Sequence, residues 1–393
     1  MMTIPEIKTV CYVGAGTMGC ANSLVAAVAG YDVIVYDVSE ENLARLPDMQ
    51  REMAEFLVAT GYCGEADVAS GLARVSCTND LATATANADL VSESVFEDLG
   101  LKRKIHKQLD AACSAKTILT TNTSALLVSD IEDVVERGDR FAALHSHLGS
   151  PLVDIVGGPR TSHATIDVLT RYVLSTKGVP LVLEKENKGY VLNAMLGAVL
   201  TTALMLVIEG AASKEDVDRA WMRHRNAPMG PFGLMDQFGL NLIYDSWRHR
   251  QPDPVGDVLA PTILAFVGPY IEKGDLGART GRGFYGYPEP AYAKPAFLAN
   301  DADDSIPHYA MTAALVGNAI LLASNDILPP AEIDRAWMVG MSLDIGPFGI
   351  LDDMGVDSCI ALLGSEASSL SPDQAGQVKR YLRRQEEPLH VNG

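Results

Sequence analysis

Positive charge is scarce in this chain of 393 residues, which has 31 Lys and Arg against 50 Asp and Glu and a formal net charge of -19. Phosphate groups repel so acidic a protein, so the composition excludes a general binder of nucleic acid or of anionic membranes. Long apolar runs are also lacking. The longest, Met195–Ile208, contains two threonines and is shorter than the about 20 residues that span a bilayer. We expect a buried core helix there and no membrane partner.

The C-x-x-C spacing of zinc knuckles and thioredoxin-like redox sites is missing. The six scattered cysteines are expected to be small buried apolar residues, and no metal site is predicted. The segment Met1–Lys8 lacks the apolar stretch of a secretory signal, so we expect a cytoplasmic protein. The remaining composition, 48% hydrophobic and 21% charged, is that of a folded globular protein, and the length predicts two or three domains.

A glycine turn stands between two β-rich runs near the start of the chain. The first run, Thr9–Val13, is followed by G-x-G-x-x-G and an apolar helical pattern, and the second, Asp32–Tyr36, ends at Asp37. This order is typical of a dinucleotide-binding fold, in which glycines permit the tight turn and the pyrophosphate meets the helix N-terminus. The predicted cofactor-binding residues of the turn are Gly14, Ala15, Gly16, Thr17, Met18 and Gly19.

Asp37 indicates which dinucleotide is bound. It follows the turn by about 20 residues, where a carboxylate accepts hydrogen bonds from the ribose hydroxyls. A 2′-phosphate at the same place would be repelled by the negative charge. The sequence therefore predicts NAD, rather than NADP, as the cofactor.

Further β-rich runs alternate with helical patterns as far as residue 186. Helices are expected at Ser39–Ala59 and Glu65–Ala73, and between the first three of the following runs. Such alternation predicts a mostly parallel sheet covered by helices on both faces, an α/β Rossmann-type domain at residues 1–186. The additional strands are expected at Asp89–Val95, Thr117–Thr121, Phe141–His145, Leu152–Val156 and Val179–Leu183.

From residue 187 the chain changes to long helical patterns and repeats itself at a constant offset of 116 residues. The repeated segments include DRAWM at Asp218–Met222 and Asp334–Met338, and GPFG at Gly230–Gly233 and Gly346–Gly349. This predicts a duplicated all-α domain, with one copy at 187–287, a proline-rich linker at 288–304 and a second copy at 305–393. Tyr309 stands in the second copy where the first has Asn193, so the second copy is interpreted as degenerate.

These blocks resemble the L-3-hydroxyacyl-CoA dehydrogenase family. The resemblance covers roughly residues 7–287. It implies a Rossmann-type domain followed by a helical domain, with NAD-dependent hydride transfer to or from a secondary alcohol β to a thioester or carboxyl group. The duplicated helical copy is consistent with either a monomer or a homodimer. The matching blocks are VGAGTMG (13–19), ADLVSESVFEDLGLK (88–102), NTSAL (122–126), RFAALH (140–145), LVDIVGGPRTS (152–162), GYVLN (189–193), PMGPFGLMD (228–236) and TGRGFY (280–285).

The resemblance also implies the roles of individual residues. His145 matches the family's catalytic histidine, a general acid/base, and Asp154 stands where the family has the glutamate that orients it. Ser124 matches a serine that binds the substrate oxygen, although it is also placed to cap the following turn. Asn193 matches an asparagine of the catalytic cleft. The implied cofactor-contacting residues are Glu97, Lys102, Asn122 and Arg279.

The sequence departs from the family after His145. The family pattern His-Phe-Phe-Asn-Pro is replaced by Ser146, His147, Leu148 and Gly149, and the loop to Asp154 is about three residues shorter. His147 is an alternative base. Basic residues are also few over residues 39–74, where the family binds CoA, so the substrate is either an acyl-CoA or a small non-CoA hydroxy acid.

Two other readings remain open. The β-hydroxyacid dehydrogenases share the glycine-rich start but use a helical lysine as the acid/base group. Here Lys188 and Asn193 lie in the right region at the wrong spacing. The altered segment after His145 also leaves open an NAD(H)-binding protein without enzymatic activity.

Overall fold

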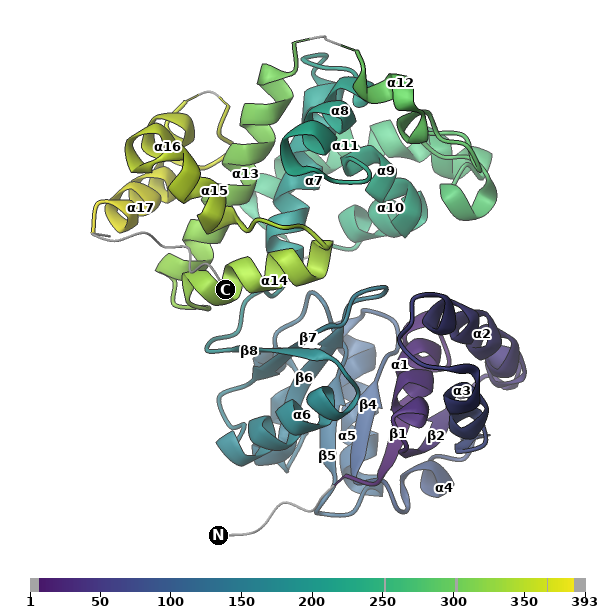
Figure 1. Cartoon of the computed structure of the whole chain (residues 1–393). Helices are drawn as coiled ribbons and strands as arrows, with labels where there is room; N and C mark the ends of the chain where they lie inside the picture. Colours follow the sequence, from purple (N-terminus) through teal and green to yellow (C-terminus); the bar gives the residue numbers. More distant parts are fainter. Residues whose placement is uncertain (1–6, 251, 301–302, 366, 385–393) are drawn as a thin grey trace. The chain divides into compact units, whose positions relative to one another are not determined.

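The computed structural model describes residues 7–250, 252–300, 303–365 and 367–384, so part of Met1–Lys8 lies outside the described residues (Figure 1). Contacts between residues divide the chain into two units. Unit 1 holds the residues up to Val191 together with Asp326–Leu328 and Val339–Met341, and unit 2 holds the remainder from Leu192. Both helical copies thus fall largely into unit 2, and the first division lies five residues after the expected boundary at 186.

Unit 1 is built on an eight-stranded sheet in the order β3-β2-β1-β4-β5-β6-β7-β8. Neighbouring strands are parallel except for β6 and β7, which are antiparallel. The predicted Rossmann-type, mostly parallel sheet is therefore confirmed. The strands are β1 Thr9–Val13, β2 Asp32–Tyr36, β3 Val75–Thr78, β4 Leu90–Glu93, β5 Ile118–Thr121, β6 Phe141–Ser146, β7 Leu152–Gly157 and β8 Val179–Leu183.

Helices cover both faces of this sheet (Figure 1). The central strands are buried on both faces, as continuous apolar runs in a parallel sheet require, and Val10, Leu90 and Ile118 are at most 1% exposed. Of the strands, β3 was not predicted, because its four residues VSCT are short and only half-buried at the sheet edge. The helices are α1 Thr17–Val28, α2 Glu40–Ala59, α3 Glu65–Leu72, α4 Leu81–Thr85, α5 Leu99–Ala112 and α6 His163–Ser175.

The prediction of a helix between β5 and β6 is wrong. That segment forms three short 3-10 turns, η1 Val128–Asp130, η2 Glu132–Val134 and η3 Gly138–Arg140. The side chain of Asp130 accepts the N–H of Leu127 at 3.1 Å, the capping-box bond at the start of η1.

The helices after Val191 preserve the offset of the sequence repeat. The helix pairs α8 and α14, and α9 and α15, begin and end 116 residues apart, which confirms the duplication. The helices are α7 Leu192–Ile208, α8 Lys214–Arg225, α9 Pro231–Phe238, α10 Leu240–Arg248, α11 Pro254–Lys273, α12 Pro295–Leu298, α13 Ser305–Ser324, α14 Pro330–Met341, α15 Pro347–Met354, α16 Val356–Leu363 and α17 Pro372–Leu382.

A buried carboxylate explains why DRAWM and GPFG recur together. Asp218 accepts the N–H groups of the Phe and Gly of GPFG at 2.8 and 3.0 Å, and Asp334 does the same in the second copy at 2.8 and 3.1 Å. These bonds satisfy the free N–H groups at the start of α9 and α15. A Cβ at Gly230 or Gly346 would lie 2.3 Å from an atom of the aspartate, so the glycine makes room for it.

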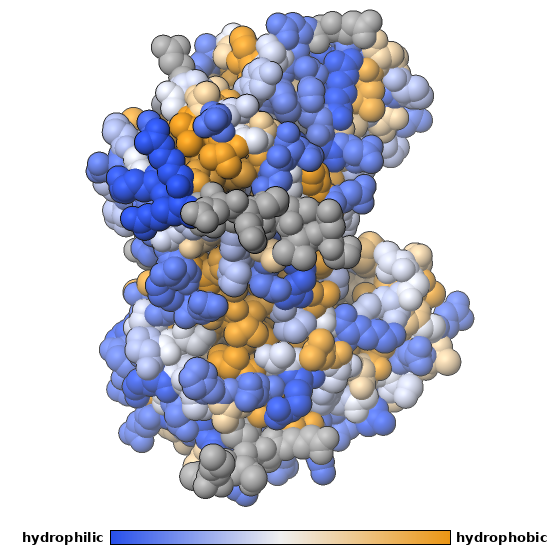
Figure 2. Space-filling model, turned by 60° about the vertical axis from the view of Figure 1, so that its left-hand side comes forward, coloured by the Kyte–Doolittle hydropathy of each residue, from blue (hydrophilic) through white to orange (hydrophobic). Residues whose placement is uncertain are grey.

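Two helices among the described residues, α11 and α13, are long and apolar enough to cross a membrane by length and composition alone. The apolar window of α13 is 72% buried, as expected of a core helix, and α13 packs against α7 within unit 2. The window of α11 is 17% buried and contains two prolines. On the face shown in Figure 2, hydrophilic side chains cover most of each unit, with apolar patches between them.

Candidate active site

The glycine turn after β1 is so tight that two of its glycines admit no side chain. Gly14 has a φ of +106°, and a Cβ there would lie 2.7 Å from the carbonyl oxygen of Ser94. A Cβ at Gly19 would lie 1.8 Å from the carbonyl oxygen of Gly14. Gly16, at the N-cap of α1, has open space where its Cβ would be. A phosphate can therefore approach the backbone here, where helix N–H groups favour an anion.

Asp37, at the end of β2, is tied to this turn. Its Oδ2 accepts the N–H of Ala15 and its Oδ1 accepts the N–H of Ser39, both at 2.8 Å. Asn42 Nδ2 donates to Oδ2 at 3.3 Å. The half-buried carboxylate thus lies beside the turn, and unit 1 brings together the glycines and the acid that the sequence predicted as the cofactor site.

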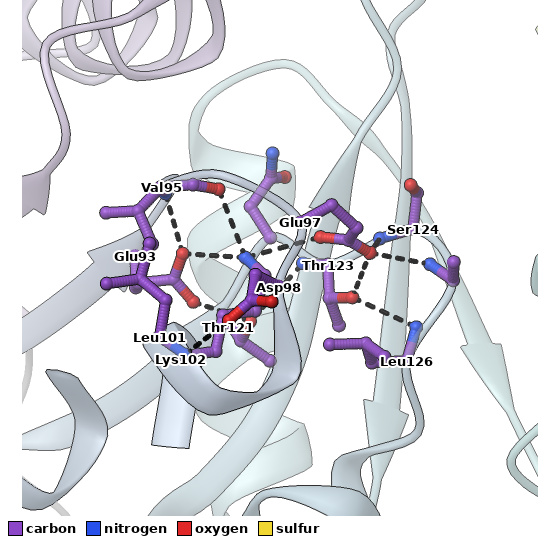
Figure 3. A network of polar contacts seen from close by, with 12 residues as sticks. Glu93, Val95, Glu97, Asp98, Leu101, Lys102, Thr121, Thr123, Ser124 and Leu126 are labelled. Carbon is purple, nitrogen blue, oxygen red and sulfur yellow. Dashed lines mark hydrogen bonds and ion pairs between the residues drawn. The ribbon is translucent and has the colours of Figure 1, made fainter. Parts of the chain in front are cut away.

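A buried ion-pair network lies at the end of β4 (Figure 3). Glu93 Oε1 pairs with Lys102 Nζ at 2.7 Å, and Glu93 Oε2 lies 3.2 Å from His106 Nε2. Burial alone would raise the pKa of Glu93, but the hydrogen bond of His106 and the charge of Lys102 outweigh it and lower the pKa to about 2. Lys102 also reaches Val95 O at 3.3 Å and Glu97 Oε2 at 3.4 Å.

Lys102 is the cation of this network. Its side chain is 1% exposed, and its ammonium group, which has three hydrogens, lies within reach of three protein oxygens. Lys102 thus holds Glu93 and Glu97 in place. Its contact with the cofactor stays a prediction.

Glu97 in turn orders the segment after β5 (Figure 3). Its Oε1 accepts the N–H groups of Ser124 and Ala125 at 2.9 Å each, and the hydroxyl of Thr123. Thr123, and not Ser124, caps this turn, because Thr123 Oγ1 accepts the N–H of Leu126 at 3.1 Å. The hydroxyl of Ser124 points away from the network in Figure 3, so it is left to meet a ligand.

Asn122 fastens the end of β5 to the end of β6. Its Oδ1 accepts the N–H of Ser146 at 2.9 Å, and its own N–H donates to Glu93 O at 2.7 Å. The predicted residues Glu97, Asn122 and Ser124 therefore lie on connected segments at the carboxyl ends of β4 and β5, the edge where open α/β sheets bind ligands.

His145 and Asp154 form a hydrogen-bonded pair. They are direct cross-strand partners in the antiparallel ladder of β6 and β7, so their side chains leave the same face of the sheet. His145 Nδ1 lies 2.9 Å from Asp154 Oδ2, with the two residues 6% and 0% exposed. The shorter Asp, in place of the family's Glu, reaches the imidazole because the strands pair directly at this position.

A second imidazole binds the same carboxylate oxygen. His147 Nε2 lies 2.8 Å from Asp154 Oδ2, and the two histidine rings meet edge to face with their centroids 4.5 Å apart. A tetrahedral zinc ion would hold two such ligand atoms ~3.3 Å apart. The separations of 2.8 and 2.9 Å are those of hydrogen bonds, so we interpret the group as a carboxylate that orients two imidazoles.

Burial and the neighbouring charges set the protonation of this group. Burial is the largest influence on the pKa of His145 and lowers it; the charge of His147 also lowers it, and the bond to Asp154 opposes the change without reversing it. Burial would raise the pKa of Asp154, but the hydrogen bonds from His145 and His147 prevail and lower it. The site therefore holds an ionised carboxylate beside a neutral imidazole near neutral pH.

Tyr190 is a neighbour of this site that the sequence did not single out. Its ring lies 5.2 Å from that of His145, and its φ of 47° is unusual for a residue other than glycine. Its buried hydroxyl has no hydrogen-bond partner among the described residues. The signal available in the sequence was its place in GYVLN, directly after Gly189.

A cavity of about 740 Å³ in unit 1 opens beside His147. Its walls come from α1, α2, α6 and the connection between β6 and β7, and they are mostly apolar, with Phe56 and Leu148 among them. Among the described residues that line it, Lys177 is the one cationic side chain and Glu52 the one acidic side chain. The ammonium of Lys177 donates to the carbonyl oxygen of Tyr62 at 2.8 Å.

The other predicted site residues belong to unit 2. Asn193 is half-buried in the first turn of α7, and Arg279 is exposed in the 3-10 turn Ala278–Thr280. Their roles stay predictions.

Comparison with known proteins decides the family. The description "3-hydroxyacyl-CoA dehydrogenase, NAD binding domain" matches residues 9–187, and "3-hydroxyacyl-CoA dehydrogenase, C-terminal domain" matches residues 189–287 and again 309–386. The chain belongs to the 3-hydroxyacyl-CoA dehydrogenase family. The second match to the C-terminal domain agrees with the duplicated helices. As a member of this family, the protein is an NAD-dependent oxidoreductase that acts on CH–OH groups.

Its relatives include mitochondrial hydroxyacyl-coenzyme A dehydrogenase of Mus musculus, 33% identical over 72% of this chain and 91% of that protein. A probable 3-hydroxybutyryl-CoA dehydrogenase of Bacillus subtilis is 32% identical over 72% of this chain and 99% of that protein. Among solved structures, a diketoreductase of dicarbonyl compounds is 32% identical, with a TM-score of 0.66 over 72% of this chain and 100% of that one. Escherichia coli 3-hydroxybutyryl-CoA dehydrogenase, 20% identical, shares the fold over 97% of this chain and 100% of that one, with a TM-score of 0.77.

Proposed function

We propose that the protein transfers a hydride between NAD and a secondary alcohol or ketone β to a thioester or carboxyl group, with His145 as the general acid/base. The observation that carries this proposal is the bond of 2.9 Å between His145 Nδ1 and Asp154 Oδ2. With Nδ1–H donating to the carboxylate, the free lone pair of the neutral ring is on Nε2, the tautomer that a base requires.

The proton chemistry follows from this pair. In alcohol oxidation, Nε2 of His145 accepts the hydroxyl proton, and Asp154 stabilises the imidazolium that forms. In ketone reduction, the imidazolium returns the proton to the carbonyl oxygen. Bound NAD supplies the acceptor or donor of the hydride. Ser124, whose hydroxyl is left unengaged by the network around Glu97, is assigned to the substrate oxygen, and Asn193 to the substrate from the helical unit.

The cofactor site is assigned to the glycine turn and its neighbours. Open space at Gly16 supports pyrophosphate binding at the start of α1, and the position of Asp37 beside the turn supports binding of the ribose hydroxyls. Glu97 and Asn122 are assigned to the nicotinamide side of the site, and Lys102 supports Glu97 from behind.

A second candidate is the same reaction on a β-hydroxy or β-keto compound without CoA. The cavity beside His147 favours it, because a single lysine among its lining residues offers little charge to the phosphates of CoA. A diketoreductase among the relatives acts on dicarbonyl compounds.

NADH oxidation with three ketones tests both candidates. The substrates are acetoacetyl-CoA, the acetoacetyl thioester of N-acetylcysteamine, which has the same reacting group without the nucleotide, and ethyl acetoacetate. An acyl-CoA enzyme should prefer acetoacetyl-CoA over the truncated thioester by at least about tenfold in kcat/KM, about 1.4 kcal/mol of nucleotide binding. Equal values would favour the second candidate. No turnover of any of the three, with NADH binding demonstrated by fluorescence, would reject the proposed reaction.

A further inference from the structure

Asp154 accepts two hydrogen bonds from histidine side chains, both at the same carboxylate oxygen, Oδ2. Oδ2 lies 2.9 Å from His145 Nδ1 and 2.8 Å from His147 Nε2, while the buried Oδ1 has no hydrogen-bond partner among the described residues. The two imidazoles therefore share one carboxylate oxygen and divide its negative charge between two hydrogen bonds. The resemblance implies Phe at position 147, a side chain that cannot form such a bond.

We propose that His147 is a positioning residue that shares Asp154 with His145 and thereby extends alcohol oxidation to lower pH. This inference rests on the proposed role of His145 as the acid/base. His147 does not exchange a proton with the substrate in this account; it acts through the carboxylate.

His147 favours the neutral form of His145 because the two imidazoles share the negative charge of Asp154. A hydrogen bond from His147 stabilises ionised Asp154, so the carboxylate offers less stabilisation to an imidazolium at His145. A protonated His147 would add a like charge whose ring is 4.5 Å from that of His145. Both effects favour the neutral form of His145, which is the base that oxidation needs, and both add to the effect of burial.

The remaining neighbours of His145 do not replace this effect. Glu97 contributes a negative charge that favours the imidazolium, and Tyr190 presents its ring at 5.2 Å. Of the charged and titratable groups that face His145, His147 alone shares its hydrogen-bonding oxygen. His147 also lines the cavity of about 740 Å³, so the side chain that restrains Asp154 stands where a ligand can reach it.

Two variants of His147 separate the effect of its hydrogen bond from the effect of its charge, and a variant of Asp154 tests whether both act through the carboxylate. His147→Phe removes both the donor and the charge, and His147→Gln keeps a neutral N–H donor. Histidines labelled with ¹⁵N in the full chain report the pKa of His145 directly by NMR, without any substrate. The same substitutions in Asp154→Asn show whether His147 acts through the carboxylate.

We expect the pKa of His145 to rise in His147→Phe, to rise less in His147→Gln, and to change much less in the Asp154→Asn background. In kinetics, the acid limb of kcat/KM for oxidation and the basic limb for reduction should both move to higher pH in His147→Phe. The plateau rates should change less than the limbs.

Titration of His145 at the same pH in the wild type, His147→Phe and His147→Gln would overturn the inference. If His147→Phe fails to fold, His147→Leu, which also removes both the donor and the charge, takes its place. An unshifted pKa of His145 in that variant would overturn the inference, while His147→Gln reports only the influence of the His147 charge. Failure of the proposed function looks different: the wild type would turn over no β-hydroxy or β-keto compound, while the NMR comparison would still report whether His147 and His145 are coupled.

Discussion

At the scale of single residues, the ionisation of a buried carboxylate depends on the groups that form hydrogen bonds and ion pairs with it. Asp154 remains ionised although it is fully buried, because two imidazoles bind it, and Glu93 remains ionised because Lys102 and His106 do. The pairing of His145 with a carboxylate nine positions away was predictable only through the resemblance, since no sequence pattern states that β6 and β7 are antiparallel. The shared use of Asp154 by His147 depends on the pairing register and could not be read from the chain.

The ion pair beneath the site gives a prediction about stability. Lys102→Met leaves Glu93 buried and short of its closest cation, and we expect it to lower the free energy of unfolding by about 3–5 kcal/mol. Lys104→Met, an exposed lysine on the same helix α5, is the matched control and should change it by less than about 0.5 kcal/mol. Urea unfolding of both variants measures the difference.

The same variant should show a pH signature. The folded-state pKa of Glu93 is lowered from 4.5 to about 2, so its ionisation stabilises the fold above about pH 4.5, and this stability is lost as the pH falls towards 2. The deficit of Lys102→Met should therefore be full at neutral pH and shrink on acidification through this window. A deficit independent of pH would assign the loss to packing instead of charge.

At the scale of elements, continuous apolar runs predicted the buried strands, while short or exposed segments were not predicted correctly. Strands β1 and β2 have the predicted bounds, because buried parallel strands read as continuous apolar runs flanked by turn residues. The segment between β5 and β6 was expected to be helical, but it forms three 3-10 turns of three residues each. The edge strand β3 is too short and too exposed to give a pattern.

The repeated helix start gives a prediction at this scale. A Cβ at Gly346 would lie 2.3 Å from Asp334 Cγ and would push the carboxylate from the N–H groups that it binds. Gly346→Ala should cost about 1–3 kcal/mol, the range for buried polar groups left without partners, measured by thermal or urea unfolding.

The control is a glycine that has room for a side chain. Gly197 lies within α7, and a Cβ there meets no atom within 4 Å. Gly197→Ala should stabilise the protein by about 0.5–1 kcal/mol, because alanine loses less backbone entropy in a helix. Equal stability of Gly346→Ala and the wild type would contradict the capping role of Asp334.

At the scale of the whole molecule, the second helical copy separates this chain from the relatives that align with 72% of it, whereas the Escherichia coli structure shares the fold over 97% of the chain. The mouse and Bacillus subtilis proteins align with 72% of this chain and with 91% and 99% of their own lengths. The constant offset of the repeat predicted the extra copy, but not that α13 would pack against α7 within one unit. The meeting of Asn193 with the histidine pair remains a prediction, since it depends on the two units together.

The central claim is that His145 moves the proton during hydride transfer, and a single-turnover experiment tests it most directly. NADH deuterated at its transferable position is mixed with the most active of the three ketones, and the deuterated alcohol is quantified by mass spectrometry. His145→Gln should bind NADH as the wild type does, since the glycine turn and Asp37 are untouched, and should form product about 10²–10⁴-fold more slowly. Product formation by His145→Gln at the wild-type rate would contradict the account.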